Sequence, residues 1–228
     1  RGSLSRSGLL LAAALLGLVA GTPGVATARV GDGGGTAFGI RWAWSVAGDA
    51  IGYKGLEVVD LNGDDRPEIL AAADPWASGG YWYVLERQGD DLVQIYSSLP
   101  RADGVMGLAA GATNGRVSIV VVGSSSLSVY DGASRREMAS FPTASTDQRA
   151  LAVADIDGDG ILDAVVCDGS NLYVYELLLG SVRTKFGFGC TDIAIGQTDA
   201  DPQLEIALAG NASGGFVLDG LSLLVDWA

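Results

Sequence analysis

The stretch of this sequence best equipped for chemistry is residues 155–163, DIDGDGILD. Carboxylates occupy its positions 1, 3, 5 and 9, and glycines occupy positions 4 and 6. Carboxylates this close repel one another, and a hard cation such as Ca²⁺ relieves the repulsion because it takes about 6–8 oxygen ligands. We therefore predict a calcium site here, with the ligands Asp155, Asp157, Asp159, Asp163 and the backbone carbonyl of Ile161.

The first five positions of this loop also match an EF-hand loop. That loop is twelve residues long, carries a Glu at its last position and is followed by a helix. Here the last acid stands at position 9, and the apolar run of residues 164–166 predicts a β-strand after it. The pattern is therefore not typical of an EF-hand.

Two further segments repeat the spacing. Loop one (residues 60–68) offers Asp60, Asn62, Asp64, Glu68 and the carbonyl of Arg66. Loop four (residues 197–205) offers Gln197, Asp199, Asp201, Glu205 and the carbonyl of Gln203. Because Gln197 carries no charge, we expect loop four to bind calcium more weakly than loop three (residues 155–163), or not at all. Loop two (residues 110–118) has lost its acids, and we predict no metal there.

The charge balance favours metal sites over simple solvated turns, which are the alternative for any single loop. Ten of the 27 acidic residues are proposed metal ligands in loops one, three and four, and the remaining 17 nearly balance the 14 basic residues. The net charge of −13 also argues against nucleic acid as a partner. The absence of histidine excludes Ser-His-Asp and Cys-His catalysis and any His-ligated zinc site.

The acidic loops recur with the strands around them. Each follows an alternating apolar run and ends at a residue that opens a second such run: Glu68, Ser118, Asp163 and Glu205. The intervals between these residues are 50, 45 and 42. A repeat of roughly 45 residues is typical of the blades of a β-propeller.

Two more apolar runs complete each repeat, so each contains about four short antiparallel strands. The pairs Asp131-Gly132 and Asp219-Gly220 predict hairpin turns. The fold class is therefore all-β, a β-propeller of four-stranded antiparallel blades, with about four blades and essentially no helix. Residues 41–44 resemble residues 225–228, which leaves two alternatives: a compact four-bladed ring, or part of a larger ring, which we favour.

The N-terminal residues have the pattern of a targeting signal. A basic start, an apolar run over residues 9–20 and the sequence Ala26-Thr27-Ala28 predict a signal peptide over residues 1–28, with the propeller over 29–228. The run is too short for a membrane span, so we expect none in the mature chain. The protein is then secreted or periplasmic, and an oxidising compartment would allow Cys167 and Cys190 to pair. Two buried thiols are the alternative.

Loop three matches in full the pattern of FG-GAP and VCBS-type repeats, D-x-[DN]-x-D-G-x-x-D between two apolar strands. Loop one departs from it at the Gly and the final Asp, and loop four at the first Asp and at Pro202. The resemblance covers residues 50–228. It implies an integrin-α-like β-propeller whose loops hold structural calcium.

These features favour a non-enzymatic binding, adhesion or scaffold module whose partner is an extracellular protein or glycan. Four aromatic residues lie close together in the first repeat: Trp76, Tyr81, Trp82 and Tyr83. They could form a ligand surface, or they could pack between strands. The alternative function is the propeller domain of an extracellular carbohydrate-active enzyme. Such an enzyme needs catalytic groups outside the loops, and Asp74, Glu86, Asp90 and Asp91 show no spacing that demands catalysis.

Overall fold

The computed structural model describes residues 51–73, 80–211 and 214–227, which fold as sixteen β-strands with no helix in these ranges. The strands form four antiparallel sheets of four strands each. Every sheet uses four strands that are consecutive in the sequence, so each is a meander. The all-β class and the four-stranded repeat are thereby confirmed.

The four sheets, here called blades one to four, follow one another along the chain. Blade one contains β1 (Ile51–Val59), β2 (Glu68–Ala73), β3 (Trp82–Gln88) and β4 (Asp91–Ser97). Blade two contains β5 (Gly107–Thr113), β6 (Arg116–Val122), β7 (Ser126–Asp131) and β8 (Glu137–Pro142). Blade three contains β9 (Ala150–Ala154), β10 (Asp163–Cys167), β11 (Asn171–Glu176) and β12 (Val182–Phe186). Blade four contains β13 (Asp192–Gly196), β14 (Glu205–Asn211), β15 (Gly214–Asp219) and β16 (Val225–Trp227).

The second strand of a blade begins at the residue predicted from the repeat in three blades: Glu68, Asp163 and Glu205. In blade two, β6 begins at Arg116, two residues before the predicted Ser118. The reason is the turn at Asn114 and Gly115, whose φ angles of 50° and 72° are those of a tight two-residue hairpin. The pair Asn114-Gly115 predicts this turn, whereas the repeat spacing alone predicts the start at Ser118.

Alternating side chains of each strand give every blade two apolar faces, because successive residues point to opposite sides of a sheet. In β6, Val120 and Val122 pack against Ala164 and Val166 of the following blade, and all four are essentially inaccessible to solvent. Equivalent cores fill the seam between blades one and two and the seam between blades three and four. The blades are thus held together by apolar packing from one blade to the next.

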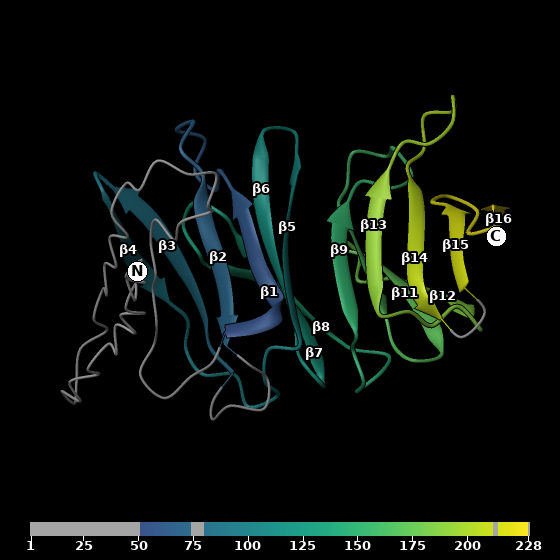
Figure 1. The fold of residues 1–228 in the computed structure, drawn as a ribbon, viewed down its shortest axis with the longest axis horizontal. Helices are drawn as coiled ribbons and strands as arrows, with labels where there is room; N and C mark the ends of the chain where they lie inside the picture. The colour runs from purple at the N-terminus through teal and green to yellow at the C-terminus, as the bar shows by residue number, and fades with distance from the viewer. Residues whose placement is uncertain (1–50, 74–79, 212–213, 228) are drawn as a thin grey trace, which may run out of the picture.

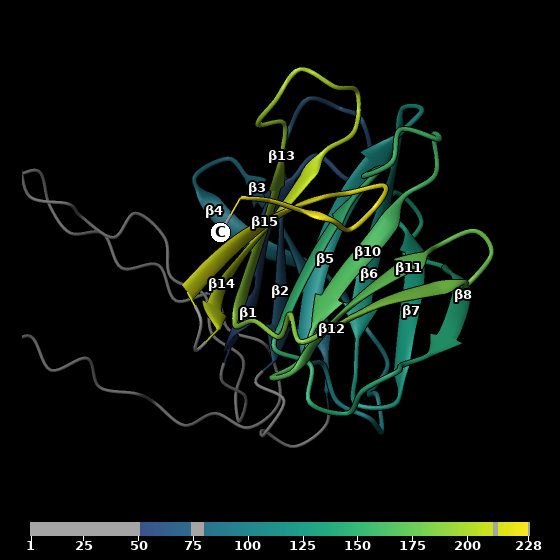
Figure 2. The same cartoon turned by 90° about the vertical axis from the view of Figure 1, so that its right-hand side faces the viewer.

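The innermost strands contact one another in chain order, β1 with β5, β5 with β9 and β9 with β13. Figure 1 shows these four strands side by side across the middle of the molecule, with the outer strands fanning away from them. Figure 2 gives the view from the side of blade four. The four blades therefore form an arc.

The connections between first and second strands all lie at one end of the arc, the upper end in Figure 1. Loops one to four are these connections. The fold thus gathers the acidic loops on one side of the molecule.

The two Asp-Gly pairs do begin hairpin turns, but in neither turn is the glycine the left-handed residue. The turn after β7 has its positive φ at Arg135 (60°), and the turn after β15 has it at Leu223 (55°). Gly132 is needed for space instead, because a Cβ there would lie 2.9 Å from the carbonyl oxygen of Leu61. The glycine lets this turn pack closely on loop one of the preceding blade.

The predicted signal peptide over residues 1–28 and the aromatic segment at residues 41–44 lie outside the described residues. Among the described residues, no helix is long and apolar enough to cross a membrane.

Candidate metal loops

Loop three folds back on its own carboxylates. The two carboxylate oxygens of Asp155 accept the backbone N–H groups of Gly158 and Gly160, both at 2.9 Å. Asp159 accepts the N–H of Ile161 at 2.7 Å. Gly158 and Gly160 have φ angles of 76° and 86°, the left-handed conformation that their positions required. The glycines therefore allow the backbone to curl around the acidic side chains.

This curl brings the carboxylates together. Asp155, Asp157 and Asp159 each place a carboxylate oxygen within 4.8 Å of the others. At such distances their negative charges repel. The arrangement suits a divalent cation with oxygen ligands.

The ninth residue of loop three is a buried acid. Asp163 accepts the N–H of Ile156 at 3.3 Å, and its residue is 3 % exposed. Burial raises the pKa of Asp163 to about 7, with a further rise from Asp157 and Asp159, while the Ile156 N–H and Arg183 lower it. Its charged form is therefore poorly stabilised by the protein alone, and a bound cation would stabilise it.

Loop one follows the same plan as loop three. Asp60 accepts four backbone N–H groups, among them those of Gly63 and Asp65 at 2.8 Å each. Glu68 is buried and accepts the N–H of Leu61 at 2.8 Å, and burial raises the pKa of Glu68. The other oxygen of Glu68 accepts the side-chain amide of Asn62 at 3.2 Å. Loop one is thus a preformed turn in which Asn62 takes the place that Asp157 has in loop three.

Loop four shows what the glutamine at its first position does. The amide nitrogen of Gln197 donates to the backbone carbonyls of Asp201 and of Gln203, the latter at 2.9 Å. The Gln203 carbonyl is one of the expected metal ligands, so an uncharged donor already occupies it. Meanwhile Asp199, Asp201 and the buried Glu205 bring carboxylate oxygens within 4.8 Å of one another.

Glu205 keeps one oxygen unpaired. Its Oε2 accepts the N–H of Thr198, whereas its Oε1 is buried and has no hydrogen-bond partner. A buried acceptor without a partner costs free energy, and a nearby cation would remove that cost. In loop four, therefore, the Gln203 carbonyl is already hydrogen-bonded to Gln197, while one oxygen of Glu205 still lacks a partner.

Loop two supports its neighbour. The side chains of Thr113 and Asn114 donate to the backbone carbonyl of Gly160 in loop three, at 3.1 and 3.3 Å. Arg116 lies outside the turn and pairs with Asp131 at 3.5 Å. Loop two thus acts as a brace for loop three.

The structure adds residues that the repeat pattern did not point to. Arg183 of β12 lies 3.9 Å from Asp157 and donates to the carbonyls of Gly220 and Leu221 in blade four. Ile156, the second residue of loop three, is fully buried in the core between blades three and four. Loop three is therefore joined to blade four by both polar and apolar contacts. A lone arginine in an outer strand carries no sequence signal for such a role.

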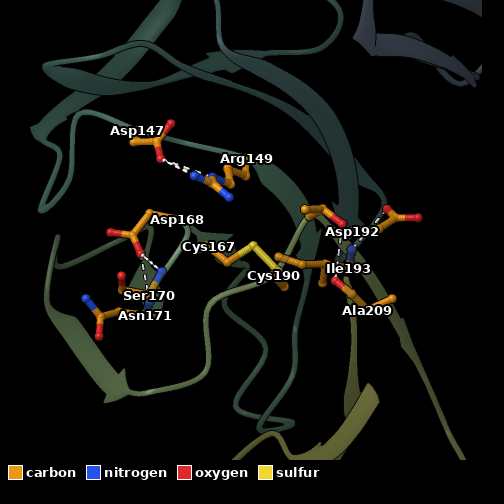
Figure 3. Close-up of a disulfide and its surroundings, with 11 residues drawn as sticks. Asp147, Arg149, Cys167, Asp168, Ser170, Asn171, Cys190, Asp192, Ile193 and Ala209 are labelled. Atoms are coloured by element: carbon orange, nitrogen blue, oxygen red, sulfur yellow. Dashed lines mark hydrogen bonds and ion pairs between the residues drawn. A yellow bond between two sulfur atoms is a disulfide. The ribbon is translucent and has the colours of Figure 1, made fainter. Parts of the chain in front are cut away.

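Cys167 and Cys190 form a disulfide, with their Cα atoms 5.7 Å apart. The bond joins the end of β10 to the connection before β13, and so spans blades three and four (Figure 3). Beside it, Asp168 accepts the N–H groups of Ser170 and Asn171 at 2.7 and 2.6 Å. The pairing that the sequence left open is thereby settled.

The aromatic residues of blade one are packing groups. Trp82 is fully buried, and its ring lies 4.8 Å from that of Tyr96 and 5.1 Å from that of Tyr130. Tyr83 is also buried, and Tyr81 is half-buried. A ligand surface on Trp82 and Tyr83 is therefore wrong, and Trp76 lies outside the described residues.

No known protein-family profile matches the chain, and no curated protein matches its sequence. Solved structures do match. In the crystal structure of BBS1N in complex with ARL6DN, a chain matches with a TM-score of 0.59 at 14 % identity, over 80 % of this chain and 55 % of that one. The Neurospora crassa Pan2 WD40 domain gives 0.55 at 13 %, over 75 % and 48 %. The V. cholerae biofilm matrix protein Bap1 gives 0.51 at 17 %, over 83 % and 42 %.

At these identities the likeness concerns the fold. WD40 domains are β-propellers with blades of four antiparallel strands. The chain spans about half the length of the structures it matches. The four meander sheets are therefore blades of a β-propeller.

Proposed function

We propose that this chain is a calcium-binding β-propeller of the FG-GAP/VCBS type, exported from the cytoplasm, that binds or scaffolds a partner and is not an enzyme. The observation that carries the calcium assignment is the acid at the ninth position of loops one, three and four. Each is almost fully buried and bonded to the N–H of the second loop residue: Glu68, Asp163 and Glu205. Buried carboxylates are retained when they are paired or coordinate metals.

Loop three is the strongest of the three sites. Asp155, Asp157, Asp159 and Asp163 would hold the ion together with the carbonyl of Ile161, and their oxygens are the ligand type that calcium prefers. Calcium would neutralise the cluster and fix the connection between two strands of a blade. Because Ile156 and Arg183 join this loop to blade four, the ion would also stabilise the seam between blades three and four.

Export and a binding role have separate support. The disulfide between Cys167 and Cys190 suits an oxidising compartment, as does the predicted signal peptide. Among the structural neighbours, Bap1 is described as a biofilm matrix protein, and BBS1N is bound to ARL6DN. A scaffold of rigid blades that carries its variation in loops fits such roles.

Calorimetric titration of the whole chain with calcium tests the metal assignment. We expect binding with Kd near or below about 1 mM, the range of extracellular calcium sites. Asp157→Asn should remove the loop-three site, and Asp64→Asn should weaken loop one. Asp65→Asn is the matched control, since it removes the same charge beside Asp64 at a position outside the ligand set. Calcium heats that are absent, or equally reduced by the control, would contradict the assignment.

A further inference from the structure

A polar cavity of about 470 Å³ lies in the seam between blades one and two. Its walls are formed by β4, by the connection over residues 98–103, and by β7 and β8. Six hydroxyl groups line it: those of Tyr96, Ser98, Ser126, Ser128, Tyr130 and Ser140. The volume falls within the range of small-molecule sites, roughly 300–1,000 Å³. None of the acidic loops contributes to it.

One wall of the cavity is fixed by Arg101. Its side chain is 9 % exposed, and its guanidinium pairs with Asp103 at 3.1 Å. It also donates to the hydroxyls of Ser126 and Ser128 at 2.7 and 2.8 Å, and to the carbonyl of Gly104 at 3.3 Å. Every nitrogen of this guanidinium has an acceptor, so Arg101 shapes the site and has little left to offer a ligand.

Arg135 is the opposite case. It lines the same cavity, and its Nη1 donates to the carbonyl of Ala133 at 2.8 Å. Its Nη2 makes no hydrogen bond with the described residues, its buried Nε has no acceptor, and no described carboxylate lies within ion-pair distance of it, although the side chain of Glu137 also lines the cavity. The hydroxyl of Tyr96 likewise has no hydrogen-bond partner in the described part of the chain. The Arg135 guanidinium and the Tyr96 hydroxyl can therefore both form hydrogen bonds with a ligand in the cavity.

We propose that this cavity binds a saccharide unit that carries a carboxylate. The carboxylate accepts from Arg135, since hydrogen bonds between guanidinium and carboxylate are among the strongest in proteins. Sugar hydroxyls pair with the surrounding serine and tyrosine hydroxyls, which both donate and accept. Among the lining residues only Leu99 and Pro100 lack a polar side-chain group, so most of the lining side chains can form hydrogen bonds with a ligand. This names a ligand class for the binding role proposed above and rests on that role, but it needs no calcium in the cavity.

Calorimetric titration of the whole chain with short oligomers of galacturonate, glucuronate and mannuronate tests the proposal, with neutral galactose oligomers as the comparison. We expect at least one uronate to bind and the neutral sugars to bind at least about tenfold more weakly, a difference of about 1.4 kcal/mol. Arg135→Gln should weaken uronate binding by about tenfold or more. Arg136→Gln is the matched control: it removes the same charge from the next residue, which is exposed and does not line the cavity.

Three results would each overturn the proposal: no uronate binds to the folded chain, neutral sugars bind equally well, or oligoglutamate binds as tightly as the uronates. An equal effect of Arg135→Gln and Arg136→Gln would also overturn it, because the attraction would then be general charge. Calcium-dependent melting of the same samples separates the two proposals. If calcium still stabilises the chain while no uronate binds, the cavity assignment alone fails.

Discussion

Gln197 offers a single-residue test of what the first position of an acidic loop does. Its amide nitrogen donates to the carbonyls of Asp201 and Gln203, while the Oε1 of Glu205 stays without a partner. A carboxylate at this position cannot donate, so it would free both carbonyls and add a charge. We therefore expect Gln197→Asp to strengthen calcium binding at loop four by about tenfold or more, or roughly 1.4 kcal/mol.

The same calorimetric titration that counts the wild-type sites checks this expectation. Gln197→Asn, which keeps an uncharged amide, is the control and should leave loop four weak. A Gln197→Asp chain with no added calcium heat would show that loop four is only a turn.

The environment of Glu57 predicts that the stability of the folded chain depends on pH, independently of calcium. Its side chain lines a cavity of about 410 Å³ along the innermost strands and accepts the N–H of Ala110 at 2.6 Å. Burial raises the pKa of Glu57 above its ordinary value of 4.5. The folded chain then binds this proton more tightly than the unfolded chain, so the contribution of Glu57 to stability is greatest below its ordinary pKa and is lost as pH rises through the raised pKa.

Glu57→Gln removes this titration and retains an oxygen to accept from Ala110. The variant should melt about 2 °C higher than wild type at pH 8 and nearly equally at pH 4, which corresponds to less than about 1 kcal/mol in a domain of this size. Melting curves at the two pH values check it. A difference that is the same at both would mean that the charge of Glu57 is not the cause.

Loop three shows how far residue patterns reach. The spacing of its acids and glycines predicts both the positive φ at Gly158 and Gly160 and the convergence of the carboxylates. The contact of Arg183 with Asp157 could not be predicted, because it depends on how an outer strand lies over the loop. Likewise the donor role of Gln197 follows from its side-chain conformation, which the sequence does not contain.

At the scale of elements, the turn after β15 is a spacer between blades. A Cβ at Gly220 would overlap the carbonyl oxygen of Leu204 and lie 2.6 Å from that of Ile156 in loop three. Gly220→Ala should therefore push blade four away from loop three and destabilise the fold by about 1–3 kcal/mol. Gly196→Ala, in β13, is the control, since a Cβ there meets open space.

Denaturant unfolding of the two variants checks this, with Gly196→Ala expected to stay within about 0.5 kcal/mol of wild type. Equal stability of Gly220→Ala and wild type would mean that the turn can move away from loop three without loss.

The strands themselves are the part that the sequence predicts best. Alternation and period place the outermost strand of blade three over residues 182–186, where β12 is found. β6 starts two residues earlier than the repeat predicts, because the tight hairpin at Asn114 and Gly115 makes the loop of blade two shorter than the acidic loops of the other blades. Local turn chemistry overrode the repeat at that point.

At the scale of the whole molecule, the disulfide ties together the last two blades. Its partners, Cys167 and Cys190, stand 23 residues apart and connect blade three to the start of blade four. Closing a loop of this length restricts the unfolded chain and contributes about 3 kcal/mol. The double variant Cys167→Ser/Cys190→Ser should lose about that much in denaturant unfolding, and reduction of the wild-type chain should do the same. Unchanged stability in both would show that seam packing alone holds the two blades.

The seams follow from sequence only in part. Apolar alternation predicts that each blade has two apolar faces, and the cores between blades confirm it. The sequence does not show which buried residue meets which across a seam, nor that Tyr96, Arg101 and Arg135 enclose a polar cavity. Those contacts bring together side chains from different blades, and the repeat period does not fix their geometry.

The most direct test of calcium as a structural element is thermal unfolding of the whole chain in about 1 mM calcium and in chelator. A site with Kd of about 0.1 mM then adds about 1.4 kcal/mol. Two or three such sites should raise Tm by roughly 6–17 °C. Asp157→Asn should remove part of that rise, and Asp65→Asn should leave it whole. The same Tm in calcium and in chelator would contradict the account, and the acidic loops would then be turns that their own backbone holds.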